Sequence, residues 1–280
     1  MVTIPPSGDA PAASDRELRQ VAASFGAEAD RYDRSRPSYP APMVEAIIEA
    51  APGPSVLDVG VGTGIAARLF TERGCKVLGV DIDERMAEVA RRHGIEVEVA
   101  RFEEWEAKSR KFDVVVSAQT WHWIDPEAGA ARAAEVLGAE GRLALCWNVF
   151  QPPPEIAAAF SEIARGVLPA AVPDFWARPL LQTYEPVFAG SENGVRASGA
   201  FTEPERWLYE WERPYTTAEL LDQVPTAGGF NRLPSEQVER FLTATGEAID
   251  ALGGKFTMAY TTVVVTAVRT ERQERLQLAQ

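Results

Sequence analysis

The sequence predicts a doubly wound α/β fold, and three observations support the prediction. The mostly apolar run Val56–Val59 is followed by three alternating glycines and then by apolar residues at helical spacing. Further short apolar runs alternate with helical patterns along much of the chain. The second run, Lys76–Val80, ends in the acidic residue Asp81. A strand, a glycine turn, a helix and an acid after the next strand are typical of a sheet that binds a nucleotide-like ligand.

Seven strands and the helices between them follow from the pattern of apolar residues. Lys111–Ser117 is almost continuously apolar, which indicates a central strand buried on both faces. Trp207–Tyr215 alternates large apolar and charged residues, which indicates one exposed face. The remaining strands are expected at Val56–Val59, Lys76–Val80, Ile95–Ala100, Leu143–Asn148 and Thr257–Arg269. Helices are expected at Leu18–Asp33, Met43–Ala50, Ile65–Phe70, Glu84–Arg92, Pro126–Leu137, Glu155–Leu168, Thr217–Val224 and Pro234–Leu252.

The glycine turn consists of Gly60, Gly62 and Gly64. Residues without a Cβ let the backbone turn sharply and let a ligand lie directly against it. The spacing is GxGxG, whereas dinucleotide folds use GxGxxG. Asp58 stands two residues before the first glycine, where it can accept hydrogen bonds from a ligand ammonium group or orient the loop amides. The stretch Leu57–Gly64 resembles motif I of the class I S-adenosylmethionine-dependent methyltransferases.

Two other stretches are similar to the small-molecule, type 11-like subfamily of these enzymes. Near the N-terminus the subfamily carries Phe-x-x-x-Ala-x-x-Tyr-x-x-x-Arg-Pro-x-Tyr-Pro as a lid over the cofactor. The likeness ends near Arg269, after Leu-Pro-x-Glu, Gly-Gly-Lys-Phe and Tyr-Thr-Thr-Val-Val patterns. It implies a Rossmann-like doubly wound sheet of seven strands, mostly parallel, with an antiparallel last strand and a helical cap insertion. The residues that match the lid motif are Phe25, Ala29, Tyr32, Arg36, Pro37, Tyr39 and Pro40.

The resemblance implies S-adenosyl-L-methionine as cofactor and places several residues around it. Asp81 is expected to accept hydrogen bonds from both ribose hydroxyls, and Ile82 to lie against the adenine ring. Arg101 stands where such enzymes usually carry an aspartate that contacts the adenine amine. This departure leaves adenine recognition to the Phe102 amide and Glu103.

Further cofactor contacts are expected from the lid and from the end of the fourth strand. Arg36 is suited to pair with the methionine carboxylate, and Tyr32 to cover the sulfonium or reach the substrate. The alternative is a surface arginine and an aromatic ring packed on the core. Ser117 and Gln119 face the site because ligands bind outside the carboxyl ends of parallel strands.

The chemistry expected is methyl transfer by in-line displacement, which depends mainly on positioning. If the acceptor must lose a proton, the candidate bases are His122, Tyr32, Glu210 and Glu212. His122 can equally be a packed or helix-capping residue. Aromatic side chains suit a flat, apolar acceptor such as a phenolic or indole natural product, methylated on C, N or O, but the tryptophans can also be core residues. The substrate-site candidates are Tyr39, Trp121, His122, Trp147 and Glu210, with Trp123 and Trp211 as further possible wall residues.

Composition limits the other function classes. The formal net charge of −13 disfavours a nucleic-acid substrate, because phosphates need a basic surface. No apolar run reaches the roughly 20 residues of a membrane helix and no signal peptide is evident, so a cytoplasmic protein is expected. Cys75 and Cys146 belong to no metal-ligand cluster, and no metal site is expected. Neither the oligomeric state nor the pathway can be predicted.

The domain organisation expected is one methyltransferase domain over residues 15–280, after a disordered leader at 1–14 that is rich in Pro, Ala and Ser. The lid is expected at 18–50 and the cap insertion at about 150–203. Phe175, Trp176, Tyr184 and Phe188 of the insertion are expected either in an apolar pocket wall or in a small core of their own. Two other functions stay open: a catalytically silent cofactor-binding module and an NAD-dependent oxidoreductase.

Overall fold

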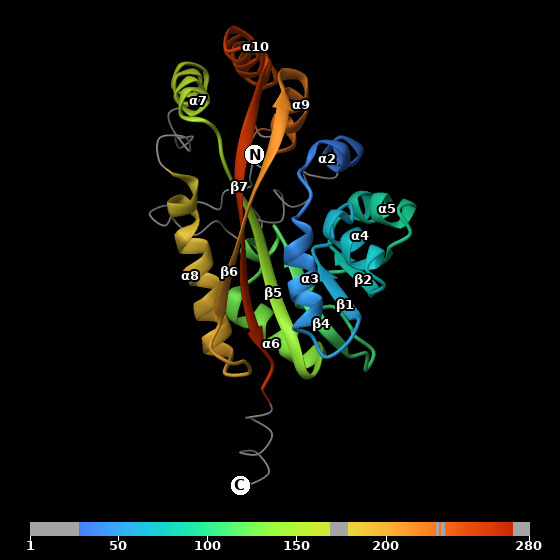
Figure 1. The fold of residues 1–280 in the computed structure, drawn as a ribbon. Helices are drawn as coiled ribbons and strands as arrows, with labels where there is room; N and C mark the ends of the chain where they lie inside the picture. The colour runs from blue at the N-terminus through green and yellow to red at the C-terminus, as the bar shows by residue number, and fades with distance from the viewer. Residues whose placement is uncertain (1–27, 169–178, 228–229, 231–232, 271–280) are drawn as a thin grey trace.

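The computed structural model describes residues 28–168, 179–227, 230 and 233–270. Their centre is a seven-stranded sheet in the order β3-β2-β1-β4-β5-β7-β6 (Figure 1). Strands β1 to β5 run parallel, and β7 is antiparallel to both of its neighbours, β5 and β6. The predicted doubly wound sheet with an antiparallel last strand is confirmed. The strands are β1 Ser55–Val59, β2 Lys76–Asp81, β3 Glu96–Val99, β4 Phe112–Ala118, β5 Leu137–Gln151, β6 Glu205–Thr216 and β7 Lys255–Val268.

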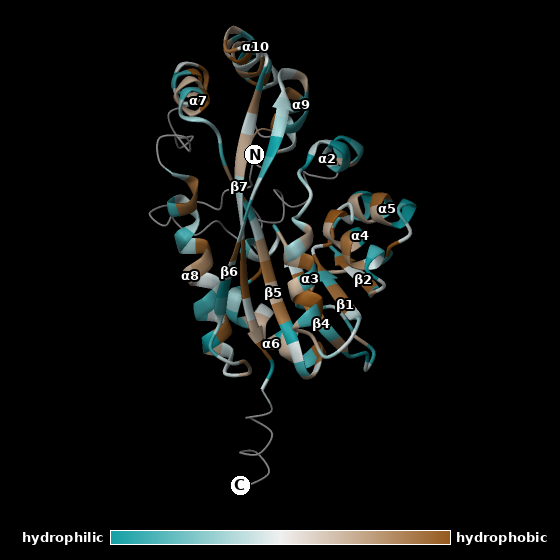
Figure 2. Ribbon diagram, viewed as in Figure 1, coloured by the Kyte–Doolittle hydropathy of each residue, from teal (hydrophilic) through white to brown (hydrophobic). Residues whose placement is uncertain are grey.

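Helices cover both faces of the sheet because the central strands are apolar on both sides. Alternate residues of β1, such as Val56 and Leu57, enter two different clusters of buried side chains. One cluster packs against α3 Ala41–Glu49 and α4 Ile65–Glu72, and the other against α6 Pro126–Val136 and α8 Leu180–Ser198. Hydrophobic residues follow the central strands, while the edge strand β6 is largely hydrophilic (Figure 2). The remaining helices are α2 Ala29–Ser35, α5 Glu84–Arg92, η2 Trp121–Trp123, α7 Pro154–Val167, α9 Thr217–Gln223, η3 Val224–Thr226 and α10 Ser235–Ala251.

The end of the molecule near the carboxyl ends of the parallel strands carries additional helices. β5 and β7 extend toward this end, where α7, α9 and α10 gather (Figure 1). β5 is longer than the predicted Leu143–Asn148, since antiparallel pairing with β7 continues from Arg142 to Gln151. The predicted strand and helices of this region are otherwise present with shifts of one or two residues at their ends.

Helix α8 lies within the cap insertion expected at about 150–203, in a part for which the sequence pattern predicted no helix. It packs along α6, β5 and β7, on one face of the sheet. Pro186 and several glycines interrupt its helical pattern in the sequence, but Gly194 fits closely against Pro126 of α6. Tyr184 and Phe188 are buried beside Trp147, whereas Phe175 and Trp176 lie outside the described residues. The leader at 1–14 and the first part of the lid also lie outside them.

No helix among the described residues is long and apolar enough to span a bilayer. Within the same part of the chain, no group of three or more His, Cys, Asp or Glu side chains is arranged to hold a metal ion.

Candidate functional site

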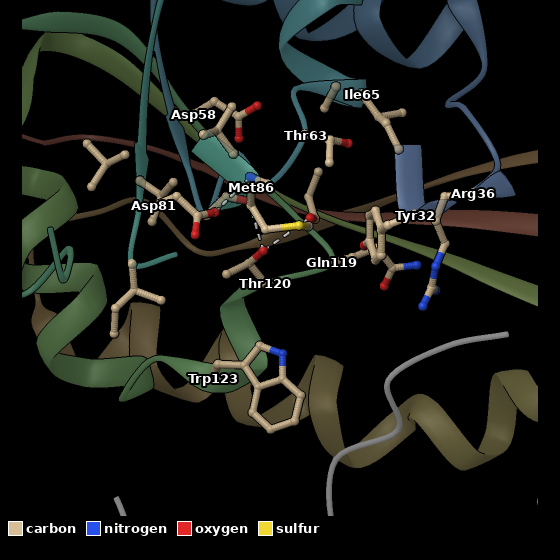
Figure 3. Close-up of a pocket in the computed structure, with 18 of the residues that line it drawn as sticks. Tyr32, Arg36, Asp58, Thr63, Ile65, Asp81, Met86, Gln119, Thr120 and Trp123 are labelled. Atoms are coloured by element: carbon tan, nitrogen blue, oxygen red, sulfur yellow. Dashed lines mark hydrogen bonds between the residues drawn. The ribbon is translucent and has the colours of Figure 1, made fainter. Parts of the chain in front are cut away.

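A single elongated cavity follows the carboxyl ends of β1, β2, β4 and β5 and is covered by the segment around α2. Figure 3 shows its labelled side chains: Asp81 and Arg36 lie on opposite sides, and Gln119 and Thr120 lie between them. The cavity thus crosses the sheet in the order of its strands. Its lining residues are Tyr32, Arg36, Pro37, Tyr39, Asp58, Val59, Gly60, Val61, Gly62, Thr63, Ile65, Ala66, Val80, Asp81, Ile82, Met86, Ala100, Arg101, Phe102, Glu103, Ala118, Gln119, Thr120, Trp123, Ile124, Asn148, Phe150, Gln223 and Tyr260.

The glycine turn adopts a backbone conformation that side chains disfavour. Gly60 has φ +69° and Gly62 has φ +56°. A Cβ on Gly60 would lie 2.1 Å from the Thr120 Cγ2, because the turn packs directly against the end of β4. A Cβ on Gly62 would have only the Met86 Cε nearby, at 3.6 Å, on the side of the cavity. Gly64, in contrast, precedes the first residue of α4 and does not line the cavity.

Asp81 connects the end of β2 to the glycine turn. Its Oδ2 accepts a hydrogen bond from the Gly62 N–H at 2.7 Å, and its Oδ1 accepts one from the Asp83 N–H at 2.8 Å. Burial raises the pKa of the Asp81 carboxyl, while these two N–H donors oppose the rise. The carboxylate is therefore held rigidly beside the turn, facing the cavity from the neighbouring strand.

Asp58 is a second buried carboxyl in the cavity wall. It is 1 % exposed, and burial together with the nearby Asp81 raises its pKa to about 7. A cationic group bound in the cavity would stabilise the ionised form of Asp58, because an opposite charge counteracts both effects. The structure therefore places two carboxyls where a ligand with hydroxyl and ammonium groups finds acceptors.

The end of the cavity beyond Asp81 is formed by apolar and amphipathic side chains. Ile82 is unusually exposed for an isoleucine, at 43 %, and Phe102 is buried with its ring near that of Trp121. Arg101 forms ion pairs with Glu103 and Glu104, both at 3.4 Å. Ile82, Phe102, Arg101 and Glu103, with Met86, line this end of the cavity and offer apolar surface and polar groups to a planar heterocycle.

The lid residues cover the opposite end. The Arg36 guanidinium lies 4.6 Å from the centre of the Tyr32 ring and donates from Nε to the Thr226 Oγ1 at 2.9 Å. It also donates from Nη2 to the Thr226 carbonyl oxygen. Tyr39 lines the cavity from the same segment. The lid is thus joined to η3, 190 residues away in the sequence.

The end of β4 contributes Gln119, which has the unusual φ of +61° for a non-glycine residue. Its Nε2 donates to the Asn148 carbonyl oxygen at 3.1 Å, and its side chain lines the cavity. Ser117 does not reach the cavity, because its hydroxyl is buried and donates to the Val59 carbonyl oxygen of β1 at 2.9 Å.

His122 lies behind the cavity wall, not in it. Its Nδ1 accepts a hydrogen bond from the Trp147 Nε1 at 3.3 Å, and burial lowers its pKa to about 3. The lone pair of the neutral ring is therefore engaged by Trp147, and the geometry does not support His122 as a general base. Trp121 and Trp147 are buried core residues, 1 % and 0 % exposed, and neither lines the cavity.

Glu210 and Glu212 are exposed on β6 and also lie outside the cavity lining. Because successive side chains of a strand point to opposite faces, Glu210 and Glu212 lie on the other face of β6 from Trp211. The Trp211 ring stacks on that of Tyr260, with 4.4 Å between the ring centroids. The predictions that Glu210 contacts substrate and that Glu212 is catalytic therefore have no support in this arrangement.

Trp123, expected as a possible wall residue, does line the cavity. Several other lining residues were not predicted as site residues: Ile124 after β4, Asn148 and Phe150 of β5, Gln223 of α9, and Tyr260 of β7. For Asn148, the sequence signal that could have identified it was the alternation of side chains along a strand. Since Asn148 faces the cavity, Trp147 must face the opposite way.

Known proteins are similar to this chain in sequence and in fold. Residues 57–145, from β1 to β5, match the family model of a methyltransferase domain. This segment of the chain, about a third of its length, is therefore similar to methyltransferase domains. An uncharacterised methyltransferase of Mycobacterium tuberculosis is 38% identical over 133 residues, which are 46% of this chain and 54% of the relative. The chain thus matches about half the length of this mycobacterial relative.

Solved methyltransferase structures share the fold. One is described as a candidate type II methyltransferase from Anaeromyxobacter dehalogenans, with a TM-score of 0.60, 22% identity, and coverage of 83% of this chain and 97% of the other. A phosphoethanolamine N-methyltransferase of Haemonchus contortus, solved with phosphomonomethylethanolamine and S-adenosylhomocysteine, has a TM-score of 0.50 and 17% identity. It covers 92% of this chain and 61% of the other. In this chain, the glycine turn within the matched segment and Asp81 lie in one cavity.

Proposed function

We propose that the protein transfers a methyl group from S-adenosyl-L-methionine to a small molecule. One observation carries the proposal: the open face of Gly62 and the carboxylate of Asp81 meet in a single cavity, with Ile82 beside them. A nucleoside fits this arrangement, since its hydroxyls need buried acceptors and its base needs an apolar slot. The GxGxG spacing and the methyltransferase relatives favour the sulfonium nucleoside over a nicotinamide dinucleotide.

The roles of the cofactor-site residues follow from their positions. Asp81 would accept hydrogen bonds from the ribose, while Ile82, Phe102 and Glu103 would hold the base, with Arg101 fixed beside them by its ion pairs. Asp58 and Gln119 would bind the amino-acid end. Gly60 brings the turn against Thr120, so that the ligand lies on backbone.

S-adenosyl-L-methionine supplies an activated methyl group when bound, and the chain supplies position and exclusion of water. Tyr32, Tyr39 and Arg36 cover the end of the cavity opposite Asp81, where the acceptor would bind. The Trp123 ring and Phe150 give this region apolar surface. They favour a small aromatic or otherwise apolar metabolite, such as a phenolic or indole natural product, methylated on C, N or O.

The acidic chain also favours a small molecule over nucleic acid. With a formal net charge of −13, it has little positive charge for a phosphate backbone. Two arginines line the cavity, and both are engaged by the protein: Arg36 bonds Thr226, and Arg101 pairs with Glu103 and Glu104.

The direct test is calorimetric titration with S-adenosylhomocysteine and, separately, with NADH. The wild-type protein is expected to bind S-adenosylhomocysteine and not NADH, and Asp81→Ala is expected to weaken binding at least about tenfold, since two buried hydrogen bonds are lost. Asp125→Ala is the matched control, because this exposed carboxylate caps α6 outside the cavity. Unchanged affinity in Asp81→Ala would contradict the proposed cofactor site.

Transfer itself is tested with donor labelled on the methyl group and a fractionated small-molecule extract. Label in an extract compound supports the enzyme, and the labelled compound identifies the acceptor. Tight binding of S-adenosylhomocysteine with no labelled product would instead favour a silent cofactor-binding module.

A further inference from the structure

The acceptor end of the cavity contains a polar side chain from outside the seven strands. The cavity runs from β2, with Asp81, across β1 and β4 to β5 and β7, with Asn148, Phe150 and Tyr260. At this last end α9 contributes Gln223. If the cofactor occupies the Asp81 end, then Gln223 lies on the side where the methyl acceptor must enter.

Gln223 is a buried amide side chain in the cavity wall. The residue is 1 % exposed, and its Oε1 has no hydrogen-bond partner among the described residues. A buried amide oxygen left without a donor is costly, and such groups usually have a ligand or another partner. The side chain therefore has an open capacity to accept a hydrogen bond, at a wall of the cavity.

Two other polar side chains of this end, Asn148 and Tyr260, are engaged by the protein. The Asn148 Nδ2 donates to the Ser38 carbonyl oxygen at 2.9 Å, and its Oδ1 accepts from the Thr262 hydroxyl at 2.6 Å. The Tyr260 and Tyr215 hydroxyls bond each other at 2.6 Å. Gln223 thus differs from Asn148 and Tyr260. Among the described lining residues it shares a buried amide oxygen without a partner with Gln119, which bonds Asn148 through its Nε2.

The position of Gln223 is fixed through its backbone and its neighbour. The Thr226 hydroxyl donates to the Gln223 carbonyl oxygen at 2.6 Å, and Thr226 is itself bonded by Arg36 of the lid. Asp222 accepts hydrogen bonds from the Nε of Arg31 and from the Nε of Arg34, both at 2.9 Å. These contacts hold the end of α9, which carries Gln223, against the lid.

We propose that Gln223 binds the methyl acceptor, with its Oε1 accepting a hydrogen bond from a hydroxyl or N–H group of that molecule. The proposal rests on the proposed transferase function and narrows its acceptor class to small molecules that carry such a donor. Phenols and indoles belong to this class, and fully methylated or purely hydrocarbon compounds do not. Gln223 is a substrate-binding residue here and takes no part in the displacement.

The test uses defined probes on the full chain saturated with S-adenosylhomocysteine. Binding of phenol and indole is compared with binding of anisole and 1-methylindole, which lack the donor hydrogen, by ligand-observed NMR titration. The wild type is expected to bind at least one donor compound about tenfold more tightly than its methylated counterpart, the effect of one buried hydrogen bond. Gln223→Leu is expected to abolish this preference.

Two further variants make the result specific. Gln223→Glu keeps an acceptor oxygen at the same place and is expected to retain the preference. Gln237→Leu is the matched control, because the Gln237 Oε1 is also buried without a partner among the described residues but does not line the cavity. It is expected to behave as the wild type.

The outcomes separate this inference from the function it rests on. If S-adenosylhomocysteine does not bind the wild type, the transferase function is overturned and this inference with it. If it binds equally well to wild type and Gln223→Leu, but the donor compounds show no preference or keep it in Gln223→Leu, this inference alone is overturned. Loss of the preference in Gln223→Glu would also overturn it, because this variant keeps an acceptor oxygen at the same place.

Discussion

The close approach of the glycine turn to β4 predicts different effects for two glycine substitutions. Gly60→Ala forces an alanine into φ +69°, which costs about 1–2 kcal/mol, and places its Cβ 2.1 Å from the Thr120 Cγ2. Relieving such an overlap in a packed region costs a further ~1–3 kcal/mol. Gly62→Ala has a similar φ, +56°, but its Cβ meets only the Met86 Cε at 3.6 Å. It should therefore cost only the backbone strain, about 1–2 kcal/mol.

Urea unfolding and calorimetry with S-adenosylhomocysteine distinguish the two variants. We expect Gly60→Ala to lower the free energy of unfolding by roughly 2–5 kcal/mol. Gly62→Ala should affect ligand affinity more than stability, because its methyl group stands at the cavity. The double variant Gly60→Ala/Thr120→Gly removes the side chain that the new Cβ meets and should recover part of the lost stability. A Gly60→Ala protein as stable as Gly62→Ala would refute the close contact between the turn and β4.

Three more perturbations test other parts of the structure. The pKa of Asp58 is about 7 in the folded protein against an ordinary 3.8, so the folded state binds this proton more tightly than the unfolded state does. The free energy of unfolding should therefore fall as the pH rises from about 4 to 7, by at most ~4 kcal/mol. Denaturant titrations across this pH range should show that Asp58→Asn removes this dependence. Gly194→Ala should destabilise the protein by about 1–3 kcal/mol, because the new Cβ would lie 2.4 Å from the Pro126 carbonyl. Gly190→Ala in the same helix places its Cβ in open space and should stabilise the protein by up to ~1 kcal/mol. Equal melting temperatures of the two variants would contradict the α6–α8 packing. Asp222→Ala should lower the free energy of unfolding by only about 1 kcal/mol, because its arginine partners on α2 are partly exposed. The same variant should release S-adenosylhomocysteine faster in stopped-flow measurements. An unchanged release rate would show that α9 does not hold the lid.

The cofactor half of the site was predictable because its residues are close in the sequence. Gly60 and Asp81 belong to one strand–turn–helix–strand unit, whose geometry follows from local backbone preferences and from the right-handed parallel crossover. The lid motif added Tyr32 and Arg36, and both line the cavity.

The acceptor half could not be predicted in the same way. Whether Trp147 or Asn148 faces the cavity depends on the register of β5 against β4 and β7, which is set by long-range pairing. Burial lowers the pKa of His122, and the side chain that bonds its Nδ1 belongs to Trp147, 25 residues away in the sequence. Helix α8 was missed because Pro186 and its glycines break the local pattern, and packing on α6 and the sheet outweighs these propensities.

By itself, the sequence determined the sheet, the glycine turn and the acidic end of β2, because apolar periodicity and glycine spacing act within a few residues of the chain. Only the tertiary structure decided which side chains form the far end of the cavity. Gln223 and Tyr260 reach it from α9 and β7, and their places depend on contacts such as those of Asp222 with α2, which no local pattern records.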